Sequence, residues 1–189
     1  FLYFFGINHP GFAGVIDVEA GEETLFGNDF TMDDIIWMGP QPSVASQAAE
    51  VGVEKSAPLS QLKQVIEAAQ LQGRQVHFLP PYRHANKLWL EELTGIRVAQ
   101  LAAQVSVELI KAIVALRSVK SALERAEVER ACDIGYEMHT TAMRMCKPGV
   151  KEQLIAGTIE GIALAHGAGV SFPTILSMNG ETLHNHYHG

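Results

Sequence analysis

Two helical patterns separated by a single break, within residues 121–166, constrain the fold more than any other feature. Ser121 precedes Glu124 by three residues, which is the spacing of a capping box, so the first helix should begin here. Apolar residues then recur at helical spacing until Lys147-Pro148-Gly149, where the helix should end because proline cannot donate to the hydrogen-bond ladder. A second helix should follow and end at Gly167. Its buried stripe would contain Leu154, Ile155, Ile159 and Ile162.

Residues 1–115 alternate between strand-like and helical patterns. Short runs of β-branched and aromatic residues are separated by turn sequences such as Asn8-His9-Pro10-Gly11. The first three runs follow one another closely and indicate a meander of strands. Helical patterns then intervene, so this block should be a mixed sheet covered by helices, an α/β fold. The strand-like runs are 1–7, 12–18, 24–26 and 74–79, and the helical runs are 58–73, 82–93 and 105–116.

The change of pattern predicts two domains, residues 1–115 and 116–189. The second block holds two helices and one strand-like run, residues 171–177, so its α+β domain should be incomplete. The chain starts within a strand-like run and without methionine, and we expect it to be a section of a longer protein. The apolar stripes of an incomplete domain should be buried against another copy, swapped or poorly ordered. These stripes include Met138, Ala142, Ile155 and Ile162.

Charge and cysteine usage exclude several classes of protein. The 189 residues carry a net charge of −7, which argues against a nucleic-acid binder and against binding to an anionic membrane surface. No apolar run reaches the ~18 residues that a membrane span needs. Cys132 and Cys146 lie in one helical pattern, ~20 Å apart on a straight helix, and cannot form a disulfide. Both should be reduced, which indicates a cytoplasmic protein.

Three histidines near the end of the sequence, His184, His186 and His188, form the sharpest local candidate for a site. Alternating residues of a strand share one face, so the three imidazoles could ligate zinc together. The alternative is a polar loop whose histidines bind nothing. The sequence contains no Cys-x-x-Cys, His-Glu-x-x-His or phosphate-loop motif.

Other chemistry-bearing residues have simpler interpretations. His77 lies in a predicted strand and should be a hydrogen-bonded core residue. Adjacent acids at 33 and 34 should form the solvated first turn of a helix. The two cysteines and both tryptophans should be core residues, and two histidines on predicted helices fit surface or interface positions equally well. These residues are Asp33, Asp34, Cys132, Cys146, Trp37, Trp89, His139 and His166.

Several segments in fixed order resemble the Xaa-Pro peptidases, namely aminopeptidase P and prolidase of the creatinase and methionine aminopeptidase superfamily. The entry into the catalytic domain is similar at 116–121, 127–131 and 146–152, and residues 172–176 followed by His186-Tyr187 resemble the strand that leads to a His-Tyr pair. The amino-terminal domain is similar at 1–6 with His9-Pro10, and at 36–39. The resemblance covers essentially the whole chain.

This resemblance implies a creatinase-type amino-terminal domain followed by the start of a pita-bread metallopeptidase domain. In the family, two divalent metals, often manganese, are held by two Asp, one His and two Glu, and activate water for attack on the bond before proline. The family's ligands lie beyond the His-Tyr strand, so this chain should contain no metal ligand, cofactor or catalytic residue and should be inactive alone. His186 matches the histidine that binds the proline-containing peptide substrate. The resemblance also implies a homodimer.

Two other functions compete with the peptidase fragment. One is a non-enzymatic oligomerisation or binding module, in which the helical extension is a dimer surface. The other is a small zinc protein that uses His184, His186 and His188.

Overall fold

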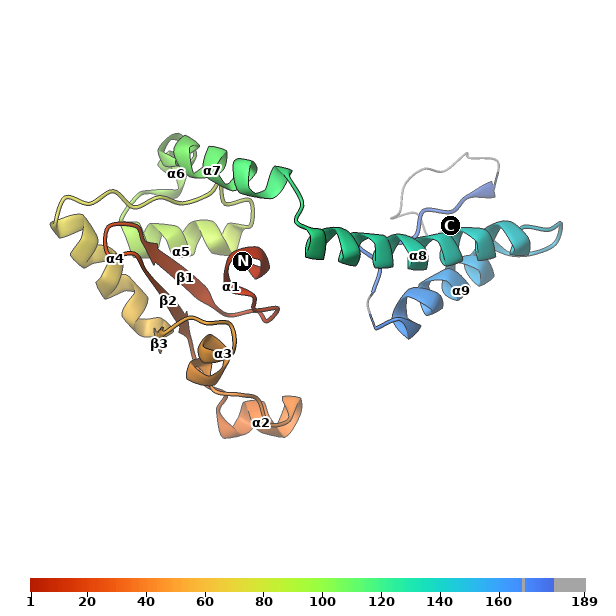
Figure 1. Cartoon of the computed structure of the whole chain (residues 1–189), viewed down its shortest axis with the longest axis horizontal. Helices are drawn as coiled ribbons and strands as arrows, with labels where there is room; N and C mark the ends of the chain where they lie inside the picture. Colours follow the sequence, from red (N-terminus) through yellow and green to blue (C-terminus); the bar gives the residue numbers. More distant parts are fainter. Residues whose placement is uncertain (168, 179–189) are drawn as a thin grey trace. The chain divides into compact units, whose positions relative to one another are not determined.

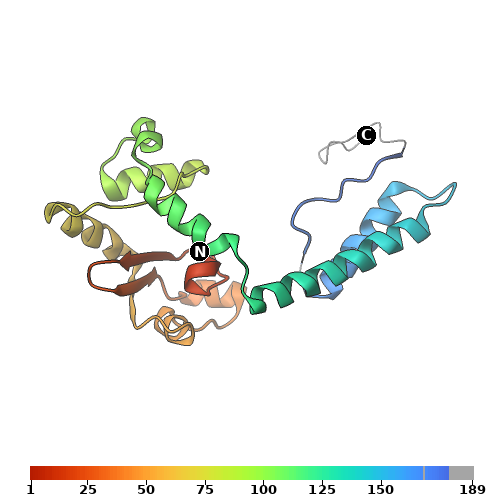
Figure 2. The same cartoon turned by 45° about the horizontal axis from the view of Figure 1, so that its top comes forward.

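The computed structural model describes residues 1–167 and 169–178, which fall into two compact units, Phe1–Ile113 and Val114–Gly189 (Figures 1 and 2). The first unit contains a mixed three-stranded sheet with helices on both faces. Strand β1 (Ala13–Asp17) pairs antiparallel with β2 (Glu22–Gly27), and β2 pairs parallel with β3 (Lys55–Pro58). The predicted α/β class is therefore confirmed.

The central strand β2 explains where the core lies. Successive side chains of a strand point to opposite faces, and both Leu25 and Phe26 are fully buried. Leu25 belongs to the cluster formed with α1 (Leu2–Phe5) and α3 (Val44–Glu50), whereas Phe26 packs with residues of α4 (Leu62–Leu71) and α5 (His84–Thr94). The remaining elements of this unit are α2 (Met32–Met38), the 3-10 turn η1 (Leu59–Gln61), α6 (Val98–Gln104) and α7 (Val107–Ser118), in which the boundary between the units falls.

Three of the predicted strands are wrong. Residues 1–7 contain the short helix α1, because Phe1 stacks on Phe5 one turn later and Gly6 stops the helix in the left-handed conformation. The predicted meander is wrong for the same reason, and the third strand, β3, returns in parallel after two helices. Residues 74–79 and 171–177 form no strand.

Helices were predicted more accurately than strands. The predicted helices at 58–73, 82–93 and 105–116 correspond to η1 with α4, to α5 and to α7, while α6 was not predicted. Asp34 lies in the first turn of α2 as expected, where it forms a capping box with Thr31. The predicted burial of Trp37 is wrong, since it is 86% exposed, whereas Trp89 packs against the Phe26 cluster.

The second unit is a pair of helices, α8 (Ala122–Met145) and α9 (Glu152–Ala165), that lie side by side (Figure 2). The capping box of Ser121 and Glu124 is present, and Gly149 and Gly167 have the positive φ that such turns need. The apolar stripes cover one another in part, so Ile155 is buried and Met138 half-buried within a single chain. Ile155 is thus covered within the chain, whereas the predicted burial of the other stripe residues against another copy stays a prediction.

The predicted burial of the two cysteines is also wrong. Cys132 and Cys146 are exposed on α8 and at its C-cap, and both are free thiols. Among the described residues, no single helix is long and apolar enough to cross a membrane. Helices α6 and α7 together pass by length and composition but bend by 60° at their junction.

A cluster of charges closes the β1–β2 hairpin in the first unit. Arg74 donates two hydrogen bonds to the Asp17 carboxylate, one of them Nη1–Oδ2 at 2.8 Å, and its Nε lies 3.1 Å from Glu19 Oε2. The Asp17 carboxylate also accepts from the N–H groups of Ala20 and Glu19. The Arg74 guanidinium and these N–H groups hold the pKa of Asp17 well below its usual value.

Arg74→Met should therefore make stability less dependent on acid pH. A carboxyl group with a lowered folded-state pKa stabilises the fold above its unfolded pKa of ~3.9 and loses that contribution as the pH falls. The Tm difference between wild type and Arg74→Met should be largest near neutral pH and shrink below about pH 4. Thermal unfolding between acid and neutral pH measures it. Lys63→Met, which breaks an exposed pair with Glu67, is the control. If Lys63→Met showed the same pH-dependent Tm difference from wild type, the effect of Arg74→Met would come from the loss of a positive charge alone.

Candidate functional site

The predicted substrate-binding residue His186, with His184 and His188, lies outside the described residues. The structure therefore tests neither the substrate site nor the zinc alternative. The described part of the second unit nevertheless contains polar contacts that arrange the chain ahead of these histidines.

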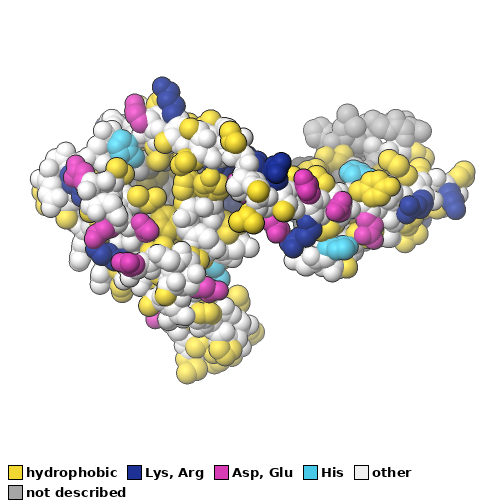
Figure 3. Space-filling model, in the orientation of Figure 1, with side chains coloured by type: hydrophobic (Ala, Val, Ile, Leu, Met, Phe, Trp, Pro, Cys, Tyr) yellow, Lys and Arg dark blue, Asp and Glu magenta, His cyan; other side chains and the backbone are white. Residues whose placement is uncertain are grey.

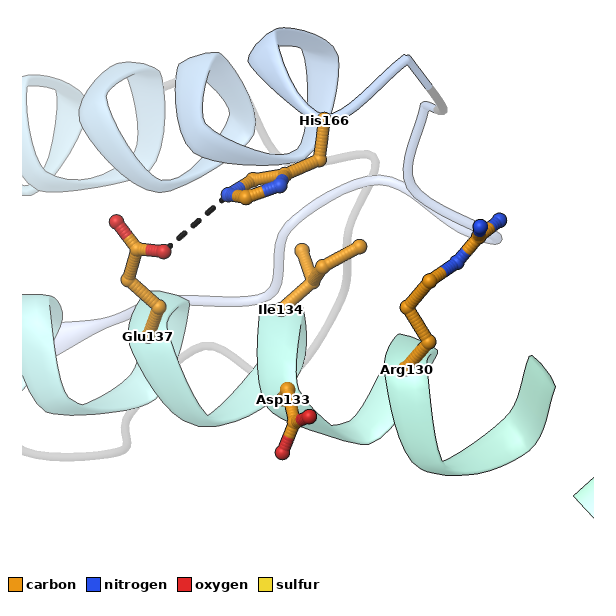
Figure 4. Close-up of a pocket in the computed structure, with 5 residues that line it drawn as sticks. All are labelled: Arg130, Asp133, Ile134, Glu137 and His166. Atoms are coloured by element: carbon orange, nitrogen blue, oxygen red, sulfur yellow. Dashed lines mark hydrogen bonds and ion pairs between the residues drawn. The ribbon is translucent and has the colours of Figure 1, made fainter. Parts of the chain in front are cut away.

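A groove of about 370 Å³ lies between α8 and the end of α9 (Figure 4). Arg130, Ile134 and Glu137 reach toward it from one side of α8, whereas Asp133 points away from the other side chains. These positions are three or four residues apart, so one helix face presents them together. The groove is completed by His166, the C-cap of α9.

The Glu137 carboxylate and the His166 imidazole connect the two helices. Glu137 Oε2 lies 3.3 Å from His166 Nε2, and both side chains are about half-exposed. Such exposed contacts contribute little stability, and Arg130 is paired with Glu127 at 2.9 Å outside this contact. The contact joins the end of α9 to α8, and His166 is an exposed residue at the edge of the helix pair. His139 is exposed on α8.

A second contact holds the chain that follows α9. The main-chain N–H of Thr174 donates to Glu160 Oε1 at 3.3 Å, and the site of this hydrogen bond is partly buried. Sequence reasoning missed Glu160. The signal was present, because after Glu152 it is the only charged residue of α9, within an otherwise apolar and small-residue run.

His77 is hydrogen-bonded, as predicted, although its side chain is exposed and lies outside any strand. Its Nδ1 lies 2.6 Å from the hydroxyl of Ser106, which is 4% exposed. The Ser106 hydroxyl also accepts from the N–H of Leu109, and the Ser106 N–H donates to the carbonyl of Phe78. These bonds join the segment before α5 to the start of α7, which is a structural role.

An apolar patch covers the short helix α2, visible as the yellow tip of that element in Figure 3. Met32, Ile36, Trp37 and Met38 are between 63% and 86% exposed, which is unusual for large apolar side chains. We call these four residues the α2 patch.

The described residues do not fit a metal centre. Within residues 1–167 and 169–178, no three side chains of His, Cys, Asp or Glu come together in a group able to hold an ion. No step of a metal-dependent reaction can therefore be assigned to them.

Two models of known protein families match this chain. Residues 1–78 match the family model described as "Aminopeptidase P, N-terminal domain", and residues 126–189 match "Metallopeptidase family M24". The chain thus carries an aminopeptidase-P-type amino-terminal domain followed by the beginning of an M24 domain. The chain is therefore similar to the amino-terminal section of Xaa-Pro peptidases, and the predicted resemblance is confirmed.

Individual relatives agree with this assignment. The chain is 29% identical over 196 residues to the Xaa-Pro aminopeptidase of Escherichia coli, covering 97% of this chain and 44% of that protein. Its fold matches proline aminopeptidase P II from Yersinia pestis with a TM-score of 0.66 at 22% identity, over 88% of this chain and 40% of that one. Zinc-substituted Escherichia coli aminopeptidase P in complex with product gives 0.69 at 23%, with the same coverage. The chain spans less than half the length of these proteins.

Proposed function

We propose that this chain belongs to a peptidase that hydrolyses the bond between an amino-terminal residue and a following proline. The observation that carries the proposal is the order of the two family matches, at residues 1–78 and 126–189, in a chain of which 97% aligns with an Xaa-Pro aminopeptidase. We assign residues 1–115 to the amino-terminal domain and 116–189 to the start of the pita-bread domain. The whole catalytic domain would then need residues beyond these.

The reaction would use two divalent ions, and we propose manganese as the native metal. When bound, such ions would lower the pKa of a coordinated water and stabilise the negative charge that develops on the substrate carbonyl. The zinc-substituted relative supports a metal requirement. The resemblance places the family's metal ligands beyond the His-Tyr strand, so we propose that the 189-residue chain does not catalyse the reaction by itself.

His186 is proposed to bind the substrate. It stands beside Tyr187 after the apolar run at 172–176, in the order that the family shows. Its imidazole would donate a hydrogen bond to the peptide near the scissile proline, which favours binding and helps to stabilise the developing oxyanion.

A peptidase assay on the full-length protein tests the proposal. With Mn²⁺, the protein should release the amino-terminal residue of an Xaa-Pro-Xaa peptide, and a chelator should abolish the activity until metal is restored. The peptide with alanine in place of proline is the control and should be cleaved at least about tenfold more slowly, since specificity of this size needs only about 1.4 kcal/mol. Cleavage that is insensitive to the chelator, or cleavage by the 189-residue chain alone, would contradict it.

A second candidate function is an oligomerisation or binding module, and the α2 patch favours it. Exposed apolar clusters on soluble domains commonly mark interaction surfaces. We propose a homodimer in either case, and sedimentation of the preparation used for the assay measures it. A strictly monomeric protein at high concentration would contradict the homodimer and weaken this alternative. The free thiols of Cys132 and Cys146 support our placement of the protein in the cytoplasm.

A further inference from the structure

The amino-terminal part of the chain is acidic throughout. Residues 1–54 contain nine Asp and Glu residues and no Lys or Arg, so they carry a charge of −9. The rest of the chain therefore carries a net charge of +2, the difference between the total of −7 and this value. Asp17 is paired with Arg74, but within the described part of the chain no ion pair neutralises Asp33 or Asp34. The α2 patch is thus an exposed apolar surface among carboxylates.

This charge distribution restricts which surface can cover the α2 patch. Large, exposed apolar side chains that lie together favour burial against a second surface. Two α2 patches packed on each other would bring Asp33 and Asp34 of both copies into one contact, and like charges at an interface are unfavourable. The surface that covers the α2 patch should therefore combine large apolar side chains with cations.

Residues 116–125 have this combination. Three of their apolar side chains are between 58% and 82% exposed, and the segment contains three cations but only one acid, Glu124. The Glu124 carboxylate accepts the N–H of Ser121 in the capping box. Arg125 forms no ion pair with another of the described residues. We define the 116–125 surface as Leu116, Val119, Leu123, Lys120 and Arg125.

We propose that two copies of this chain associate through these surfaces, with the α2 patch of one copy on the 116–125 surface of the other. A specific interface buries about 800 Å² on each partner. At ~150 Å² for a large side chain, the α2 patch alone supplies roughly 600 Å², whereas the apolar residues of both surfaces supply roughly 1,000 Å² per copy. A closed dimer contains the contact twice, so each copy uses both surfaces. The inference rests on the homodimer proposed above and not on the peptidase reaction.

Sedimentation of the 189-residue chain tests the contact. The chain should form dimers with a dissociation constant in the micromolar range, and Trp37→Ala should raise that constant at least about tenfold, because the largest side chain of the α2 patch is lost. Leu71→Ala is the matched control: it removes an exposed side chain from the end of α4 and should leave the constant within about twofold of wild type. At concentrations where the wild type is monomeric, Trp37→Ala should keep the wild-type Tm, which shows that the variant folds.

Charge reversal tests whether the two surfaces meet each other. Asp33→Lys and Arg125→Glu should each weaken the dimer about fivefold. The double variant should return the dissociation constant to within about twofold of wild type, because opposite charges then meet again with their positions exchanged. Glu50→Lys makes the same change of net charge at the end of α3, outside the contact, and should leave the constant within about twofold of wild type.

A wild-type chain that stays monomeric, or a dimer that Trp37→Ala leaves unchanged, would overturn the inference. A double variant as weak as the single variants, or oligomers larger than a dimer, would overturn it as well. Peptidase activity of the full-length protein is measured separately. An active but monomeric protein would overturn this contact and leave the reaction in place, whereas a dimer without activity would overturn the reaction alone.

Discussion

Phe26→Ala is expected to destabilise the first unit by about 3–5 kcal/mol, the cost of removing a large aromatic side chain from a closed core. Phe26 lies in the central strand β2, is 1% exposed, and packs with Leu62 and Leu93. Both faces of β2 are covered, so neighbouring side chains cannot collapse into the cavity without moving a helix. Urea unfolding followed by the fluorescence of Trp89, which packs against the same cluster, measures the loss.

Trp37→Ala is the control for this prediction. Trp37 is also a large aromatic residue of the first unit, but it is 86% exposed on α2. Its removal should change the free energy of unfolding by less than about 0.5 kcal/mol. A similar loss for Trp37→Ala and Phe26→Ala would show that the Phe26 cluster is not the core of this unit.

Helix ends could be predicted from the sequence because they depend on local chemistry. Ser121 satisfies an amide three residues away, and Gly149 and Gly167 adopt a backbone conformation that other residues avoid. None of these interactions needs a distant partner. The helix boundaries near Lys147-Pro148-Gly149 were therefore found within one or two residues.

Strand predictions were wrong where strand pairing depends on residues far away in the sequence. Residues 74–79 and 171–177 have the composition of strands, but no strand of the described sheet pairs with them. Conversely, β3 (Lys55–Pro58) has a weak strand pattern and is a strand because it pairs in parallel with β2, some thirty residues away along the chain. Composition indicates which residues tolerate an extended backbone, whereas the ladder depends on what lies beside them.

The predictions of buried helix residues and of the candidate site were limited in the same way, because both depend on contacts between distant segments. Helical spacing showed that α8 has apolar positions, but it could not show that Ile134 and Met138 would be half-buried and Cys132 exposed. Glu160 was missed because its partner is a main-chain N–H, which every residue but proline carries and no sequence pattern marks. His186 was found through the resemblance alone.

Gly14→Ala should destabilise the first unit by about 2–3 kcal/mol, because the strand β1 passes directly against an aromatic ring. A Cβ atom at Gly14 would lie 2.1 Å from Phe5 Cζ and 2.2 Å from Phe5 Cε2. Phe5 is itself buried with Leu25 and Val44, so its ring cannot move aside without disturbing that cluster. Urea unfolding of the variant gives the loss in free energy.

A double-mutant cycle separates this clash from a general cost of changing β1. Leucine has no atoms at the Cε and Cζ positions of phenylalanine, so Gly14→Ala should cost less than about half as much in a Phe5→Leu background as in the wild type. Gly135→Ala, in the interior of α8 where a new Cβ meets no atom within 4 Å, should instead stabilise the protein by about 0.5–1 kcal/mol. Equal costs of Gly14→Ala in both backgrounds would show that the Phe5 ring does not set the requirement for glycine. The close approach of β1 to α1 would then have to be explained by the backbone alone.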